Sequence, residues 1–230
     1  MFIEQLFDAV TSTYSYLLWD EKTKHAALID SVKEQVERDI TLINQLGLTL
    51  KYTLETHIHA DHITGSGLLR DEFNCQVGVH KNSNSDCADI LLSDGDALKL
   101  GDESIDIIYT PGHTDTDISY RIDGAIFSGD TLLVNGCGRT DFQSGDASSL
   151  YHSVTVKLFS LDDETVVYPG HDYHGFTATT IGREKSFNPR LGNNRSEEEF
   201  IAIMDGLILD PPARIEIAVP GNQHCGLKTT

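Results

Sequence analysis

The segment Thr56–His62 constrains this chain more than any other. It places three imidazoles and a carboxylate directly after an apolar β-forming run, in the order His57, His59, Asp61 and His62. Residues two apart in an extended chain point to the same side, so the first three share one face, and His62 joins them once the chain turns. Histidine is the commonest metal ligand, and no folding role requires this spacing. The segment therefore predicts a metal site.

Three later segments each offer one more candidate ligand. The candidates are His113, Asp130 and His171. Each follows a β-rich run and stands directly after a glycine that allows a tight turn. Strand ends that converge on one cleft would bring these side chains together. We therefore expect them to complete the metal site, whereas Asp115 and Asp117 are interpreted as turn carboxylates.

Strand-like and helix-like segments alternate along the chain. Helical spacing predicts helices at 32–46, 67–73, 147–159 and 197–207, with Ser31 and Ser196 as N-caps of the first and the last. Short β-rich runs predict strands at 14–19, 25–29, 50–54, 76–80, 97–100, 104–109, 118–121, 125–128 and 165–168. There is no internal repeat or linker, so the 230 residues are expected to form a single α/β domain over 1–230.

Composition excludes several classes of partner. The chain has 36 acidic and 17 basic side chains, and its charge of -19 repels nucleic acid and anionic membranes. No apolar run approaches the roughly 18 residues of a membrane helix, and the first ten residues do not resemble a secretory signal. The cysteines Cys75, Cys87, Cys137 and Cys225 form no C-x-x-C pair and give no support to a disulfide framework. We therefore expect a cytoplasmic location without nucleic-acid or membrane partners.

The ligand pattern as a whole resembles the metallo-β-lactamase superfamily. H-x-H-x-D-H followed by a later His, an Asp and a His spans residues 57 to 171. The resemblance implies an α/β fold, a four-layer αββα sandwich with the metal at one edge between the sheets. It does not settle the reaction, because such folds host thioester hydrolases, lactamases, nucleases and dioxygenases. Asp130, where secreted lactamases often carry cysteine, and the acidity of the chain speak against a lactamase and a nuclease.

Finer motifs are similar to the persulfide dioxygenase family. They lie at 56–65, 136–143, 188–191 and 218–222. The resemblance implies one Fe(2+) per chain, held by His57, His113 and Asp130. It leaves four residues as hydrogen-bond partners of these ligands or as the remnant of a second metal site: His59, Asp61, His62 and His171. Two imidazoles and one carboxylate leave coordination positions open, as iron(II) oxygenases require.

The same resemblance implies an oxidoreductase that converts glutathione persulfide, O2 and water to sulfite and glutathione. An anionic substrate needs a local cation in so acidic a chain, and Arg139 is the candidate for binding a glutathione carboxylate. Tyr173 is the candidate hydrogen-bond donor to the substrate. No catalytic residue is predicted beyond the metal centre, and the resemblance implies a homodimer.

Two other functions remain open from the sequence. A dinuclear-zinc glutathione thioester hydrolase, similar to glyoxalase II, would use the same ligands to generate a bound hydroxide. Glyoxalase II typically has a larger C-terminal helical domain, however, and only about sixty residues follow His171. A metal-bearing binding or regulatory protein without turnover would keep the same fold. Metal content distinguishes the hydrolase, and oxygen consumption distinguishes the inactive protein.

Overall fold

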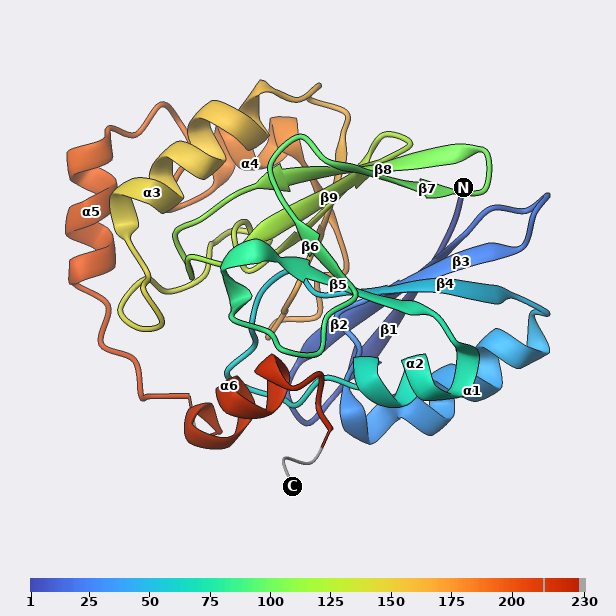
Figure 1. The fold of residues 1–230 in the computed structure, drawn as a ribbon. Helices are drawn as coiled ribbons and strands as arrows, with labels where there is room; N and C mark the ends of the chain where they lie inside the picture. The colour runs from blue at the N-terminus through green and yellow to red at the C-terminus, as the bar shows by residue number, and fades with distance from the viewer. Residues whose placement is uncertain (213, 228–230) are drawn as a thin grey trace. The chain divides into compact units, whose positions relative to one another are not determined.

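The computed structural model describes residues 1–212 and 214–227, in which the chain forms two compact units. The first unit comprises Met1–Leu92, Ala97–Ile105 and the C-terminal stretch from Asp210, and the second comprises Ser93–Asp96 and Asp106–Leu209. Each unit combines strands with helices (Figure 1). No helix of the described residues is long and apolar enough to cross a membrane. The expectation of one domain over 1–230 stays a prediction.

The first sheet has six strands in the order β1-β2-β3-β4-β5-β6. They are β1 (Phe2–Asp8), β2 (Thr13–Trp19), β3 (His25–Ile29), β4 (Thr49–Leu54), β5 (Gln76–His80) and β6 (Ile90–Leu92). The pairs among β1, β2 and β3 are antiparallel, and those among β3, β4, β5 and β6 are parallel, so the sheet is mixed. Since β3 and β4 are parallel neighbours, the loops that follow them leave the same edge of the sheet.

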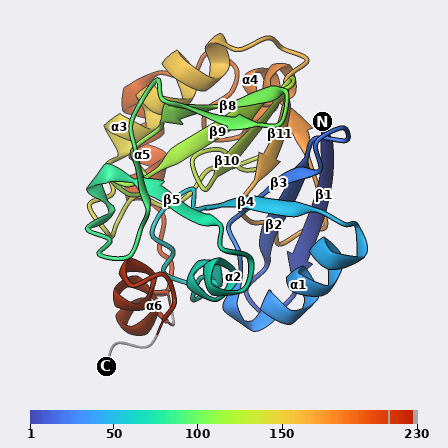
Figure 2. The same ribbon diagram turned by 45° about the vertical axis from the view of Figure 1, so that its right-hand side comes forward.

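Two helices cover one face of this sheet, as Figures 1 and 2 show. They are α1 (Val36–Gln45) and α2 (Ser66–Phe73), and a third helix of the unit, α6 (Ile215–Gln223), lies near the C-terminus. Apolar side chains of α1 and α2 pack against those of the strands, including Val36, Ile43 and Leu69 against Leu28 and Leu50. Burial of this apolar surface is the main source of stability for the arrangement.

The second sheet has the order β12-β11-β10-β9-β8-β7 and is also mixed. Its strands are β7 (Ala97–Leu100), β8 (Glu103–Tyr109), β9 (Ile118–Ile122), β10 (Ala125–Gly129), β11 (Val166–Pro169) and β12 (Thr179–Thr180). The boundary between the units falls within β8. The second unit holds α3 (Ala147–His152), α4 (Ile181–Phe187) and α5 (Glu197–Asp205). Leu150, Ile181 and Phe200 of these helices pack with Ile126 and Val167 of the sheet.

All nine predicted strands are present, to within two residues at their ends. Ser196 caps α5 in a capping box with Glu199, as predicted. The Ser31 cap is wrong: a 3-10 turn at Lys33–Gln35 precedes α1, and the Ser31 hydroxyl lies 3.2 Å from that of Thr64 instead. The helix predicted over 147–159 continues beyond α3 only as a π-helical and a 3-10 turn.

The elements that the sequence analysis missed are β1, β6, β12, α4 and α6. The strands and α4 are short or lie at a sheet edge, where no regular apolar period is required. In α6 the internal Pro220 argues against a helix. The structure also contains a disulfide between Cys87 and Cys225, which are 138 residues apart. The expectation that the cysteines support no disulfide was therefore wrong for this pair, because their approach is set by the fold and not by local spacing. Cys75 and Cys137 are buried free thiols.

Candidate metal centre

The histidine-rich segment of the first unit leaves the sheet beside a carboxylate from the neighbouring strand. Ile29 at the end of β3 is level with Leu54 at the end of β4. Asp30 and Glu55 therefore leave the same edge of the sheet, and Thr56 and His57 directly follow Glu55. Asp30 has φ 51, a left-handed conformation that Asp tolerates better than most residues and that turns its chain out of the strand. All four side chains are buried.

Thr56 determines which ring nitrogen of His57 carries a proton. The Asp30 carboxylate accepts hydrogen bonds from the Thr56 amide at 2.7 Å and from its hydroxyl at 2.8 Å. Since the only hydroxyl proton is used there, the Thr56 Oγ1 accepts from His57 Nδ1, 3.0 Å away. His57 Nδ1 then carries a proton, so Nε2 is the ring nitrogen that remains for a metal ion. This is the tautomer of a metal ligand.

His59 has a different role, since carboxylates surround its Nε2. This atom lies 3.1 Å from Asp30 Oδ1 and 3.4 Å from Glu55 Oε2. Burial alone would lower the pKa of His59, but Asp30 and Glu55 raise it well above the usual range. The two carboxylates keep a proton on Nε2 of His59. Its Nε2 therefore acts as a hydrogen-bond donor.

Asp61 and His62 complete a cluster with His59. One ligand atom of each lies within 4.8 Å of the others, so the group could hold a cation. Asp61 accepts from His62 Nδ1 at 2.9 Å and from the Thr13 hydroxyl at 3.2 Å. Nδ1 of His59 and Nε2 of His62 are buried without a hydrogen-bond partner among the described atoms. Two such nitrogens beside a carboxylate suit the chemistry of a metal ion.

In the second unit, His113 and Asp130 face each other. His113 Nδ1 donates to the Arg139 carbonyl at 2.7 Å, so Nε2 is the ring nitrogen that remains for a metal ion. Nε2 lies 3.6 Å from Asp130 Oδ2. Two acceptors at this separation require a proton or a metal ion near them. Gly138, in the motif at 136–143, allows the His113 ring to lie close to the backbone, because a Cβ at this position would lie 2.7 Å from His113 Nδ1.

His171 orients Asp130. Its Nδ1 donates to Asp130 Oδ1 at 2.7 Å, and this leaves Oδ2 directed towards His113. Gly170 lies close by, since a Cβ there would approach Oδ1 to 2.8 Å. The ring of Tyr173 stacks on that of His171 with centroids 6.1 Å apart, and the Tyr173 side chain is largely exposed.

Arg139 does not present a bare guanidinium. It forms two hydrogen bonds of 2.6 Å to the carboxylate of Asp141 and a third, of 3.2 Å, to the Leu209 carbonyl. The guanidinium also lies 5.1 Å from the centre of the Phe142 ring. Binding of a substrate carboxylate at Arg139 would therefore compete with Asp141.

Two side chains considered in the sequence analysis have structural roles. Asp117 accepts from the Thr114 amide and hydroxyl at 2.8 and 2.6 Å, as expected for a turn carboxylate. Burial raises the pKa of this carboxyl to about 6. Cys137 is buried, and burial raises the pKa of its thiol to about 11, so it is protonated at neutral pH.

The structure thus brings His57, His59, Asp61 and His62 together in the first unit, and His113, Asp130 and His171 in the second. Sequence reasoning missed Asp30, Glu55 and Thr56, which hold the histidines of the first unit. A signal was available, because each acid directly follows an apolar strand. It also missed a role for Asn222, although this residue closes the motif at 218–222.

Comparison with known proteins places this geometry in a family. Residues 8–85 and 87–171 match the model of the metallo-β-lactamase superfamily. The chain is 46% identical over 230 residues to the human protein named persulfide dioxygenase ETHE1, mitochondrial, covering 99% of this chain and 89% of that protein. It is 34% identical over 200 residues to the hydroxyacylglutathione hydrolase GloC of Haemophilus influenzae, covering 77% of this chain and 92% of that protein.

Among solved structures, ETHE1 from Myxococcus xanthus matches with a TM-score of 0.96 and 50% identity. The match covers 99% of this chain and 100% of that one. The fold predicted from the ligand pattern is confirmed as the α/β metallo-β-lactamase fold with two mixed sheets and helices. The chain belongs to the metallo-β-lactamase superfamily and, within it, to the persulfide dioxygenase family.

Proposed function

We propose that this protein is an iron-dependent persulfide dioxygenase that converts glutathione persulfide, O2 and water to sulfite and glutathione. The observation that carries the proposal is the 46% identity to the human persulfide dioxygenase over 99% of the chain. The donor chemistry supports it, because Nε2 is the ring nitrogen that remains for a metal ion in His57 and His113, and Asp130 adds a carboxylate.

The proposed metal ligands are those that the family resemblance implies. His57, His113 and Asp130 would hold one Fe(2+). Iron(II) with two imidazoles and a carboxylate supplies redox chemistry with dioxygen and open positions for a sulfur donor. His59, Asp61, His62 and His171 are then proposed as supporting residues and not as ligands of a second ion. This fits His59 and His171, each of which uses a ring nitrogen in a hydrogen bond to Asp30 or Asp130.

The residues around the ligands prepare the site for an anionic substrate. Thr56 and the Arg139 carbonyl hold the protons of His57 and His113 on Nδ1. His171 holds Asp130 by donating to one carboxylate oxygen. We further propose that Arg139 binds a glutathione carboxylate in exchange for Asp141, and that the exposed Tyr173 donates a hydrogen bond to the substrate.

Location and assembly also remain proposals. We infer a cytoplasmic location for this chain, whereas the name of the human relative assigns that protein to mitochondria. We infer a homodimer from the family resemblance. Cell fractionation and sedimentation velocity test these two points, and a monomer at micromolar concentration would contradict the second.

A zinc-dependent glutathione thioester hydrolase is the competing function. It is favoured by the 34% identity to the Haemophilus influenzae hydrolase and by the buried nitrogens of His59 and His62 that have no hydrogen-bond partner among the described atoms. Two zinc ions in a filled site would supply a hydroxide for hydrolysis.

Metal analysis of protein purified without added metal, paired with an oxygen-electrode trace, separates the two functions. About one iron per chain with oxygen uptake and sulfite formation on addition of glutathione persulfide is the expected result. Two zinc ions per chain, no uptake and cleavage of a glutathione thioester would establish the hydrolase instead. Replacing His113 with alanine should abolish both iron retention and oxygen uptake.

A further inference from the structure

The metal loop, residues 57–65, is held by a residue near the C-terminus. The side chain of Asn222 is buried, and its Nδ2 donates to the carbonyls of His59 and His62, both at 2.9 Å. Its Oδ1 accepts from the Thr64 amide at 2.8 Å. One amide thereby ties three points of the loop across about 160 residues of sequence, as the separations of 163, 160 and 158 show.

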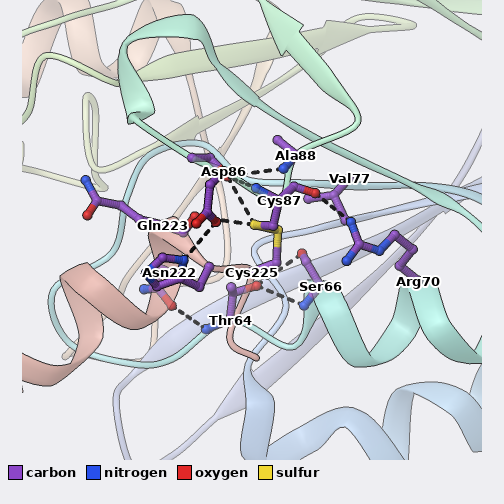
Figure 3. Close-up of a disulfide and its surroundings, with 12 residues drawn as sticks. Thr64, Ser66, Arg70, Val77, Asp86, Cys87, Ala88, Asn222, Gln223 and Cys225 are labelled. Atoms are coloured by element: carbon purple, nitrogen blue, oxygen red, sulfur yellow. Dashed lines mark hydrogen bonds and ion pairs between the residues drawn. A yellow bond between two sulfur atoms is a disulfide. The ribbon is translucent and has the colours of Figure 1, made fainter. Parts of the chain in front are cut away.

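The backbone after Asn222 continues this contact. The Cys225 carbonyl accepts from the Gly67 amide of α2 at 2.9 Å, and a Cβ on Gly67 would lie 2.6 Å from that oxygen. Gly226 has φ 71 and faces the Thr64 carbonyl, where a side chain could not fit. Figure 3 shows Asn222, Thr64 and Cys225 side by side in this arrangement. We call residues 222–226 the C-terminal strap.

A disulfide fastens the strap from its other side. Cys225 lies three residues beyond Asn222 and forms a disulfide with Cys87 (Figure 3). Three polar contacts lie beside the disulfide. Gln223 Nε2 donates to the Ser83 carbonyl at 3.2 Å, the Asp86 amide donates to the Gln223 carbonyl at 3.2 Å, and His224 Nδ1 lies 2.8 Å from Asp86 Oδ1. Cys225 is 2% exposed, whereas Cys87 is half-buried, so a reductant reaches Cys87 first.

We propose that Asn222 is a positioning residue for the metal loop, and that the Cys87–Cys225 disulfide is a thiol-sensitive cross-link that holds Asn222 in place. With the disulfide closed, the strap keeps its three hydrogen bonds to the loop. With the disulfide open, the strap loses its covalent link and keeps only hydrogen bonds, which can open and close, so the loop that carries His57 loosens. The inference rests on the proposed function only for the identity of the metal and of the thiol.

The reduction is an ordinary thiol–disulfide exchange with a low-molecular-weight thiol, the class to which the proposed product glutathione belongs. One thiolate attacks Cys87 Sγ, the bond between the two cysteine sulfurs breaks, and Cys225 leaves as a thiolate that takes up a proton. A second thiolate attacks the outer sulfur of the mixed disulfide and releases Cys87, which also takes up a proton. The protein gains two electrons, and two external thiols become one disulfide.

The test compares iron(II)-loaded full-length protein in the oxidised and reduced states, with the reductant removed before measurement. Transfer of iron to a coloured chelator should be roughly 10- to 100-fold faster after reduction, the range for loss of groups that support metal ligands. Amide hydrogen exchange of residues 57–65 should quicken in parallel. The variants Asn222→Asp and Cys87→Ser/Cys225→Ser should behave like reduced protein without any reductant.

Gln223→Glu is the matched control, because it makes the same amide-to-carboxylate change one residue away from the loop contacts. It should leave iron release unchanged, and reductant should not affect the double serine variant. The visible spectrum of cobalt(II)-loaded protein should change in Asn222→Asp and not in Gln223→Glu, which a general loss of stability would not produce.

Unchanged metal release and unchanged exchange of 57–65 in both reduced protein and Asn222→Asp would overturn the inference. If the protein binds zinc and hydrolyses thioesters, the proposed function fails. The exchange measurement, which needs no iron, still decides whether the strap holds the loop.

Discussion

At the residue scale, the hydroxyl of Thr56 connects a buried carboxylate to a proposed metal ligand. It donates to Asp30 and accepts from His57, so it transmits the charge of a buried carboxylate to the Nδ1 proton of a proposed ligand. A valine of similar shape would leave that proton without an acceptor. We expect Thr56→Val to lower iron affinity by roughly 10- to 100-fold.

Chelator competition measures this affinity, with Thr53→Val as the control, since Thr53 is equally buried but lies within β4. An affinity for iron that is equal in Thr56→Val and Thr53→Val would show that Thr56 does not set the state of His57.

Arg139 is the second residue for which the contacts predict the effect of a substitution. Its guanidinium is held by Asp141, and its carbonyl holds His113. Truncation to alanine removes the cation but keeps the carbonyl. Arg139→Ala should therefore raise KM for glutathione persulfide with a smaller change in kcat, because it removes binding that ground state and transition state share.

Steady-state oxygen uptake gives both constants for Arg139→Ala. Asp141→Asn is the companion variant, and it should lower KM by releasing the guanidinium. An unchanged KM in Arg139→Ala would exclude Arg139 from the substrate site.

At the scale of elements, α1 carries a buried carboxylate that costs stability at neutral pH. Burial raises the pKa of Asp39 to about 6 from 3.8, although Arg38 Nε donates to it at 2.8 Å. Because the folded pKa lies above the unfolded one, protonated Asp39 stabilises the fold fully below pH 3.8. That contribution is lost as the pH rises through about 6.

Asp39→Asn should remove this loss, because asparagine is neutral at every pH. Its advantage over wild type in free energy of unfolding should grow by about 1 kcal/mol between pH 5 and pH 7. Urea unfolding at both pH values measures it, with Asp71→Asn on the exposed side of α2 as the control. A constant difference across this range would mean that Asp39 is already ionised in the folded protein at pH 5.

At the scale of the whole molecule, the net charge of -19 repels itself in the folded state. Salt screens this repulsion, since the Debye length falls to about 10 Å at 0.1 M. The thermal midpoint should therefore rise by a few degrees when NaCl is raised from about 20 to about 200 mM, as followed by circular dichroism. The effect should shrink near the isoelectric point of about 4.7, and a midpoint that falls with salt would contradict the argument.

Local information in the sequence was sufficient to predict much of the fold. The alternation of apolar residues located all nine predicted strands, because side-chain periodicity is a local property of a strand. The same holds for the Ser196 cap, whose partner Glu199 is three residues away. Edge strand β1 was missed because its apolar and polar residues, Phe2-Ile3, Glu4-Gln5 and Leu6-Phe7, come in pairs and give no period of two.

The sequence by itself determined the family, and it predicts the ligand set, since His57, His113 and Asp130 stand in motifs that are read along the chain. Only the tertiary structure decided what supports these ligands. Asp30 reaches Thr56 because β3 and β4 are parallel neighbours, and Asn222 and the Cys87–Cys225 disulfide reach the metal loop from the other end of the chain. Contacts between residues so far apart depend on chain topology, and local propensity carries no information about them.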